Sequence, residues 1–336
     1  MTRIVCLGEL LLRLSAPGRE LLLQSPRLAV HVGGAEANVA VSLAKLGHST
    51  ALASVVPDNP LGAVAIGEMR RHGVDTSNVH LAAGRMGMYF LGAGAIHRPS
   101  EVLYDRAGSA FALHADMIDP EQALAGAGAL HVSGITPALG PGPAAVALRA
   151  MRAASARQVA VSFDCNYRAS LWRESNADAS RSLHDLAAYS GTLFGGIRDL
   201  ALMLRFDAGG NETEDGFRRA GEAAFAAFPK LERIATMTRR EMSVDHHELG
   251  AWLLTRDGFF AARSSAVTPI VDRIGAGDAF AAGVLHGLRR GYGDSETVQF
   301  GLAAACLKHS IPGDLNLVGE ADVRALMDDS GFGVRR

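Results

Sequence analysis

The chain has 336 residues, of which 48% are hydrophobic and 20% charged, and its net charge is −2. This composition is typical of a globular protein with a sizeable core, and it excludes a strongly basic surface for nucleic acid or an anionic membrane. No uncharged apolar run approaches the roughly 20 residues that span a bilayer. Only three of the 33 basic residues are lysines, which limits the places where an ammonium group can serve: Lys45, Lys230 and Lys308.

The three cysteines are far apart and show neither disulfide nor metal-ligand spacing, and the first residues form a strand-like run rather than a signal peptide. We therefore expect a reducing, cytoplasmic setting. The sequence contains no G-x-x-x-x-G-K-[ST] and no G-x-G-x-x-G. The first absence excludes a Walker-type phosphate loop, and the second argues against a Rossmann dinucleotide site.

Short apolar runs typical of strands alternate with Ala-rich segments of helical periodicity. In chain order, the pattern predicts strands at 4–7, 50–55, 129–132 and 159–163, and helices at 35–46, 60–72 and 143–154. Such alternation produces right-handed β-α-β units, so the predicted fold class is α/β, with a doubly wound, mostly parallel sheet and helices on both faces. No linker or change of composition divides the chain, and we expect a single domain over residues 1–336.

Two stretches interrupt this rhythm, at about 10–33 and 80–112. They carry short alternating runs with few helix formers, as in 86–90, so we expect small antiparallel strands that form a discontinuous β-flap, or lid, over the sheet edge. Open α/β sheets bind ligands beyond the carboxyl ends of their strands. The segments 131–140 and 162–172 leave predicted strands at that edge and are candidate ligand loops.

The segment VDRIGAGDAFAAGVL (271–285) predicts a glycine-rich turn at the start of a helix. Gly275 and Gly277 leave backbone amides uncovered at the positive end of this helix, where anions bind. A carboxylate at the same place repels a bound phosphate, a cost that makes sense if Asp278 takes a proton from an attacking hydroxyl. Taken alone, these residues fit equally a tight turn followed by an ordinary acidic residue of a helix N-terminus.

A second junction of this kind, HVGGAEANVAVSLAKLG (31–47), places Gly33 and Gly34 before a helix and Asn38 one turn into it. The glycines allow close approach to a ligand. Asn38 fits a ligand contact as well as a capping or exposed residue.

Two further segments set an arginine near a tyrosine, Tyr104 with Arg106 and Tyr167 with Arg168. A guanidinium fork is the side chain best shaped for a carboxylate or a phosphate, although most arginines in an arginine-rich chain are surface charges. Two arginines near a phosphate-binding junction suggest an acidic small molecule.

Together these segments resemble the ribokinase-type carbohydrate kinases, often called the PfkB family. Gly33, Gly34 and Asn38 match one family signature, and the G-A-G-D of 275–278 matches the other. The two signatures stand far apart in the family's order, and the resemblance covers nearly the whole chain. Within the family, GGAEANVAVSLAKLG, HVSGITPALG, FDCNYRASLW, DRIGAGDAFAAG and LKHSIPGDLN are most similar to 2-keto-3-deoxygluconate kinases.

The resemblance implies a ribokinase-like fold whose sheet is covered by a flap, and a homodimer that pairs through the flaps. It also implies transfer of the γ-phosphoryl group of ATP, helped by Mg²⁺, to the terminal hydroxyl of 2-keto-3-deoxygluconate or a close relative. By the same resemblance Asp278 is the general base, and the amides of Gly275, Ala276 and Gly277 form an anion hole for the transferred group.

Further positions of this sequence match the family's binding sites. The matches at the sugar-acid pocket are Gly34, Asn38, Tyr89, Tyr104, Arg106, Arg168 and Asp314. The matches at the nucleotide site are Asn166, Arg168, Thr238 and Arg239, together with Gly275 and Gly277. A neutral hexose or ribose does not need two arginines, which favours an acidic sugar as the acceptor.

Three departures from the family pattern lie on the nucleotide side. Arg273 stands where ribokinase-type chains usually have Thr, as it does in the keto-deoxygluconate-type subgroup. Gly196 replaces the Asn of a segment that often reads N-E-E-D, while Asp199 keeps an acid near the expected metal–phosphate network. The segment 236–252 lacks the glycine-rich spacing of a nucleotide loop. These changes leave the affinity for Mg-ATP, and the phosphate donor itself, open.

Two alternatives stand beside this interpretation, and the departures motivate the second. One is a kinase of the same family for a neutral sugar, such as fructose or ribose, or for a nucleoside. The other is a non-catalytic sugar-binding protein on the kinase scaffold.

Overall fold

The computed structural model describes residues 2–175, 177–208 and 213–328. A ten-stranded sheet has the order β13-β12-β11-β10-β9-β8-β1-β4-β5, with β14 paired to β12. The strands are β1 Arg3–Leu7, β4 Thr50–Pro57, β5 Val74–Ala82, β8 Ala127–Ser133, β9 Ala160–Asp164, β10 Thr192–Phe194, β11 Arg233–Ser243, β12 His246–Thr255, β13 Phe259–Ala261 and β14 Ser265–Val267. Neighbouring strands from β5 to β11 are parallel, and β12, β13 and β14 are added antiparallel. The predicted doubly wound sheet is confirmed.

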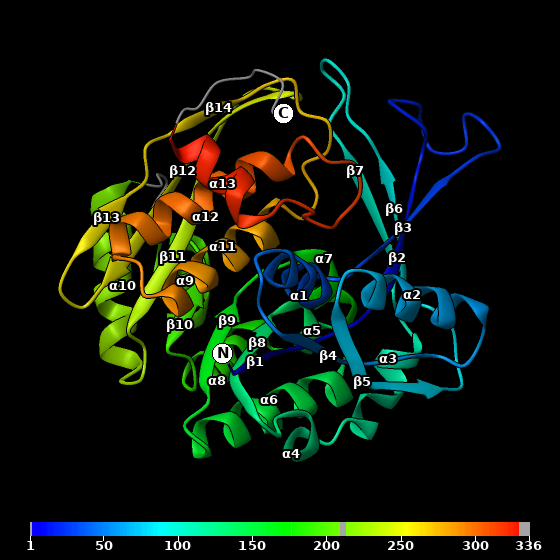
Figure 1. Cartoon of the computed structure of the whole chain (residues 1–336), viewed down its shortest axis with the longest axis horizontal. Helices are drawn as coiled ribbons and strands as arrows, with labels where there is room; N and C mark the ends of the chain where they lie inside the picture. Colours follow the sequence, from blue (N-terminus) through cyan, green and yellow to red (C-terminus); the bar gives the residue numbers. More distant parts are fainter. Residues whose placement is uncertain (1, 176, 209–212, 329–336) are drawn as a thin grey trace.

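Helices cover both faces of this sheet (Figure 1). Alternate residues of β1 explain why, since Val5 and Leu7 pack into one hydrophobic core and Ile4 and Cys6 into another. Helices α6, α8, α9 and α10 contribute to the first core, and α1, α2, α11 and α12 to the second. Within the described residues, no helix combines the length and apolar character needed to cross a bilayer. The helices are α1 Ala35–Lys45, α2 Pro60–Arg71, α3 Ala110–His114, α4 Pro120–Ala123, α5 Ile135–Ala138, α6 Pro141–Ala156, α7 Ala169–Ser175, α8 Ala179–Ala187, α9 Ile197–Leu204, α10 Glu214–Ala227, α11 Ala276–Arg290, α12 Asp294–Lys308 and α13 Glu320–Met327, with a 3-10 turn at Ala115–Met117.

A second sheet of four strands, in the order β3-β2-β6-β7, projects from the body on the right of Figure 1. Its strands are β2 Leu11–Ser15, β3 Ala29–Gly33, β6 Met88–Gly92 and β7 Glu101–Asp105. They fall within the two stretches expected to form the lid, and this sheet is called the lid below. The expectation of purely antiparallel strands is wrong for the central pair, because β2 and β6 run parallel. They follow β1 and β5, which point the same way in the main sheet.

Candidate active site

A cavity of about 760 Å³ lies at the carboxyl ends of the parallel strands, between the main sheet and the lid. All but one of the residues predicted for the site line it: Gly34, Asn38, Tyr89, Tyr104, Arg106, Asn166, Arg168, Asp199, Arg239, Gly275, Ala276, Gly277, Asp278 and Asp314. The exception is Thr238, whose hydroxyl lies over Gly250 of β12, in the space that a Cβ of Gly250 would occupy. Thr236 of the same strand lines the cavity instead.

The glycine-rich turn before α11 has the geometry expected of an anion site. Gly275 has a φ of 81°, and a Cβ added there would lie 2.0 Å from the carbonyl oxygen of Asp314, so only glycine fits. The first amides of a helix have no acceptor within the helix. The amide of Ala276 already donates a long bond of 3.3 Å to the carbonyl of Arg273, which leaves the amide of Gly277 the more available of the two.

Asp278 lies half-buried in the first turn of α11, beside the cavity. Its Oδ2 accepts a hydrogen bond of 2.7 Å from Nδ2 of Asn38, which is buried and does not cap the helix, because the N-cap of α1 is Gly34. Burial raises the pKa of Asp278 to about 6, and the negative charge of Asp314 adds to the rise. A carboxylate with this pKa is ionised at neutral pH and still basic enough to accept a proton from a hydroxyl group.

Asp314 is held from two sides by lid residues. The hydroxyl of Tyr89, on β6, donates a 2.6 Å bond to its Oδ2, and Nε of Arg13, on β2, lies 3.1 Å from its Oδ1. Arg13 also donates a 2.6 Å bond to Asp272, and Oδ2 of Asp272 accepts the amide of Gly313. The side chain of Arg13 is 1% exposed. Sequence analysis missed Arg13 and Asp272, although a charged residue inside the apolar run LLLRLS is a detectable signal.

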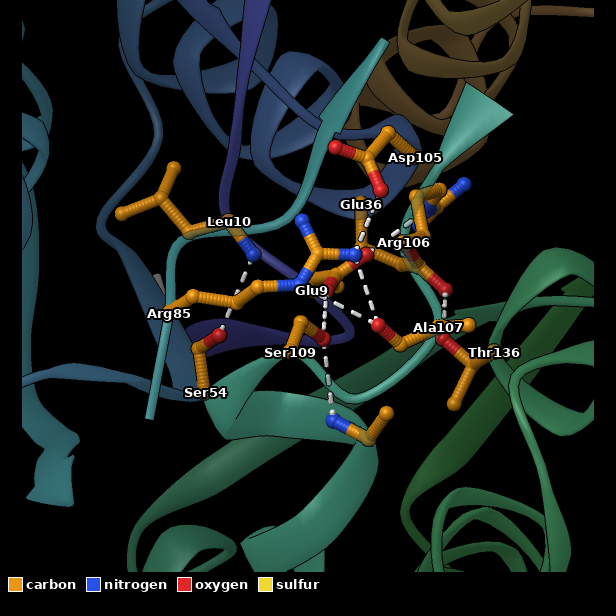
Figure 2. Close-up of polar contacts among 11 residues, drawn as sticks. Glu9, Leu10, Glu36, Ser54, Arg85, Asp105, Arg106, Ala107, Ser109 and Thr136 are labelled. Carbon is orange, nitrogen blue, oxygen red and sulfur yellow. Dashed lines mark hydrogen bonds and ion pairs between the residues drawn. The ribbon is translucent and has the colours of Figure 1, made fainter. Parts of the chain in front are cut away.

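Arg106 follows β7 and is bound to a carboxylate that the sequence analysis did not identify. Its Nε donates a 2.6 Å bond to Oε2 of Glu9, and the two side chains are 4% and 1% exposed. The hydroxyl of Ser109 donates to the other oxygen of Glu9. Figure 2 shows this cluster, with Arg85 bonded to Asp105 beside it. Arg106 is therefore fixed in place, and Glu9 compensates part of its charge.

Gly34 and Tyr104 complete the same side of the cavity. Gly34 has a φ of 141°, and a Cβ there would lie 2.2 Å from the carbonyl oxygen of Glu9, so this position also requires glycine. Tyr104 of β7 is the cross-strand partner of Tyr89, and their ring centroids are 6.3 Å apart. Two phenol groups thus stand next to each other on the lid wall.

Two acidic residues lie at the carboxyl ends of neighbouring strands, Asp164 at the end of β9 and Asp199 shortly after β10. Burial raises the pKa of Asp164, the last residue of β9, to about 8, and Asp278 and Asp199 add to the rise. The backbone amide of Asn166 donates a hydrogen bond of 3.1 Å to Oδ1 of Asp164. Asn166 has a φ of 39°, a backbone conformation that is uncommon outside glycine and is often found at functional sites. Oδ2 of Asp199 accepts the amide of Gly196 at the start of α9. Asp164 was missed, although it directly follows an apolar strand in FDCN.

Four arginines line the part of the cavity near these acids: Arg168, Arg198, Arg239 and Arg273. Nη1 of Arg239 and Nη1 of Arg273 each lie 3.6 Å from Oε1 of Glu241. Partial burial lowers the pKa of Arg239, and the like charge of Arg273 contributes. The two guanidinium groups are only weakly compensated, because the side chain of Glu241 is 59% exposed.

The segment 236–252, expected at the nucleotide, is a hairpin rather than a glycine-rich loop. Strands β11 and β12 pair from Arg233 with Thr255 to Ser243 with His246, with one irregularity near the tip. Backbone amides committed to a β-ladder are not available to cradle phosphates. At this place the chain offers guanidinium groups for an anion, where a glycine-rich loop would offer amides.

Comparison with known proteins agrees with this architecture. Residues 1–317 match the family model described as pfkB family carbohydrate kinase. The chain is 31% identical to a 2-dehydro-3-deoxygalactonokinase of Haloferax volcanii, over 99% of both chains, and 30% identical to a 2-dehydro-3-deoxygluconokinase of Bacillus subtilis, over 85% of this chain and 82% of that one. The crystal structure of the 2-dehydro-3-deoxygluconokinase of Thermotoga maritima superposes with a TM-score of 0.92 at 33% identity, over 98% of this chain and all of that one.

These matches extend over nearly the whole length of each protein, so they include both glycine-to-helix junctions and the lid. They confirm the predicted family and, with it, the enzyme class. The chain belongs to the pfkB family of carbohydrate kinases and is an ATP-dependent kinase.

Proposed function

We propose that this kinase acts on a sugar acid, transferring the γ-phosphoryl group of ATP to the terminal hydroxyl of 2-keto-3-deoxygluconate or a close relative such as its galactonate epimer. The observation that carries the proposal is a cavity that combines Asp278, at the mouth of α11, with the arginines Arg106 and Arg168. A carboxylate is the acceptor group that a guanidinium fork recognises best. The names of the relatives in Haloferax volcanii and Bacillus subtilis support the same substrate class.

In this mechanism Asp278 takes the proton of the acceptor hydroxyl while the hydroxyl oxygen attacks the γ-phosphorus of ATP. The bond from that phosphorus to the β–γ bridging oxygen breaks, and ADP leaves. The hydrogen bond from Asn38 orients the base. The amides at the start of α11, that of Gly277 above all, stabilise the charge on the transferred group.

The acids near the arginines fit a magnesium ion. Mg²⁺ prefers oxygen ligands, keeps several waters, and is bound in kinases by one or two carboxylates together with substrate phosphates. In the part of the chain that the structure describes, no cluster of three or more His, Cys, Asp and Glu side chains forms an all-protein metal site. Asp164 and Asp199 would hold the ion, which when bound would neutralise charge on the β- and γ-phosphates.

One observation favours the alternative of a neutral-sugar kinase. The ion pair between Arg106 and Glu9 removes part of the positive charge that a sugar acid would use. Arg168 then carries more of the discrimination, since its guanidinium donates to the carbonyl of Tyr167 and forms no ion pair within the described residues. A sugar-acid kinase therefore needs the charge of Arg168 to bind its acceptor, whereas a neutral-sugar kinase does not.

A coupled assay of ATP consumption with 2-keto-3-deoxygluconate, its galactonate epimer, gluconate, fructose and ribose tests the proposal. We expect kcat/KM to be highest for a 2-keto-3-deoxy sugar acid, and Arg168→Gln to lower it by roughly tenfold or more through the lost charge-assisted hydrogen bond. Arg173→Gln, on the exposed face of α7 and outside the cavity, is the matched control. Preference for fructose or ribose in the wild type would refute the sugar-acid assignment.

We also propose that two copies pair through the lid. The large apolar side chains of Val30 and Leu103 are exposed on its outer face, and those of Leu23 and Ile96 are exposed on the loops that join its strands. A second lid would cover these side chains. Light scattering of the wild type should give the mass of two chains. Leu103→Glu, placed on β7 in this face, should give the mass of one.

A further inference from the structure

Lys308 is a buried charge that the mechanism above does not use. It is the last residue of α12, its side chain is 0% exposed, and it does not line the cavity. Fully buried lysines are rare, because an ammonium group taken out of water costs several kcal/mol unless charges or hydrogen bonds compensate it. A charge kept in such a place calls for a reason.

The ammonium group of Lys308 lies behind the turn that starts α11. Its Nζ donates a 2.9 Å bond to the carbonyl of Ile311, and its Cε lies 3.4 Å from the position that a Cβ of Gly275 would take. The charged groups that face it are Asp272, Asp314, Arg13 and Asp278, and the rings of His31 and His309 are near enough to respond to its charge. Lys308 thus adds positive charge to the side of the turn opposite the cavity.

The composition of the chain makes this choice of residue informative. Of 33 basic residues only three are lysines, and the side chains of the other two, Lys45 and Lys230, reach the surface. An ammonium group is a compact point charge, whereas a guanidinium is a wide planar fork. The one fully buried lysine therefore lies where space for a cation is small, between the end of α12 and the turn at Gly275, a residue that has no room for a Cβ.

We infer that Lys308 is a positioning residue for phosphoryl transfer, a tethered cation that supports the anion-binding turn of Gly275–Gly277 from behind and favours the ionised form of Asp278. The inference rests on the role proposed for Asp278 as the base.

The ionisation of the two groups gives this role a signature in the pH profile. Burial lowers the pKa of Lys308 to about 8, while Asp272 and Asp314 act to raise it, so the ammonium is charged at neutral pH and loses its proton above about pH 8. The charge of Lys308 in turn lowers the pKa of Asp278. Activity should rise with pH as Asp278 ionises near pH 6 and fall as Lys308 becomes neutral.

The test replaces Lys308 by methionine, which keeps the length of the side chain without the charge, and compares it with Lys230→Met on the surface. We expect kcat of K308M to fall by on the order of tenfold or more, with the KM for the acceptor little changed. The acid limb of the profile should move to higher pH, and the fall above about pH 8 should disappear. K230M should match the wild type.

Chemical rescue separates this role from a merely structural one. Lys308→Ala leaves a space next to the carbonyl of Ile311, and we expect ammonium or methylammonium chloride to restore part of kcat in K308A while sodium chloride does not. An unchanged acid limb in K308M, or a loss of kcat that neither amine restores in K308A, overturns the inference. Should neither variant fold, the wild type decides, since a kcat that stays flat above about pH 8 is equally incompatible with it.

Failure of the substrate assignment leaves this test intact, because the same measurements are made with whichever acceptor the wild type prefers. Failure of the base assignment is detected separately, by an Asp278→Asn variant that keeps full activity.

Discussion

The lid side and the hairpin side of the cavity hold their arginines differently. On the lid side, Arg13 and Arg106 are 1% and 4% exposed and are bonded to buried carboxylates. On the hairpin side, Arg239 and Arg273 are each 36% exposed and share Glu241 at 3.6 Å. The arginines of the lid side are thus buried in ion pairs, whereas those of the hairpin side are partly exposed to solvent.

This difference indicates what each wall recognises. Buried pairs are expensive to form and costly to break, so they fix geometry, which suits a small acceptor that must be held at one distance from Asp278. Exposed arginines contribute charge that salt screens, which suits a flexible polyphosphate. If the proposed function holds, we expect the acceptor to be selected by shape and position and the donor to be attracted by charge.

The largest effect is expected at the point where both walls meet. Asp278→Asn should lower kcat by on the order of 10³-fold, within the range that positioned proton transfer contributes, while the acceptor still binds. Steady-state kinetics and calorimetry with the acceptor check this, with the exposed Asp116→Asn as the control. Nearly wild-type turnover would mean that another group removes the proton.

Loss of a buried ion pair of the lid should lower the stability of the fold. Arg13→Met leaves the buried Asp314 and the partly buried Asp272 without their bonded guanidinium, and we expect the free energy of unfolding to fall by about 3–5 kcal/mol. Arg19→Met removes an ion pair between the connection of β2 to β3 and Asp245 in the turn of the β11–β12 hairpin. Its side chains are 47% and 39% exposed, so the loss should cost about 1 kcal/mol or less. Urea denaturation measures both, and equal losses would contradict the distinction between the two kinds of pair.

The smallest effects are expected on the hairpin wall. Arg239→Gln and Arg273→Gln should each raise the KM for ATP several-fold to about tenfold, since each removes one charge-assisted contact, and leave the KM for the acceptor unchanged. Added salt should raise the wild-type KM for ATP but have less effect on the variants.

Two neighbouring residues sharpen this comparison. Glu241→Gln removes the counter-charge and should lower the KM for ATP. Arg240→Gln is the matched control, because Arg240 is 73% exposed, pairs with Glu248 and does not line the cavity. If R240Q raised the KM for ATP as much as R239Q, general surface charge rather than the cavity would account for donor binding.

Prediction from sequence succeeded where the signal is local. Helix and strand periodicity give the α/β alternation, and a glycine next to a helix start shows the turn at Gly275 and the acid that follows it. Pairings between distant segments have no such signal. Arg13 and Asp272 are 259 residues apart and Glu9 and Arg106 are 97 apart, so only the folded chain brings these charges together.

The lack of a local signal for pairing between distant segments also explains two predictions that differ from the structure, the strand direction in the lid and the place of Thr238. The parallel pairing of β2 with β6 depends on how two separate connections leave the main sheet. Thr238 lies in the right strand, but its side chain covers Gly250 of the next strand, which only the hairpin register determines.

The close contact between Gly275 and the carbonyl of Asp314 also constrains how this enzyme can change in evolution. At that point the start of α11 and the loop after α12 touch backbone to backbone, with no side chain between them to absorb a shift. A mutation that shifts the backbone of Asp314, an acceptor contact in the proposed function, also displaces the start of α11. New acceptor preferences are therefore expected to arise through lid residues such as Tyr89 and Tyr104, while the backbone contact between Gly275 and Asp314 stays the same.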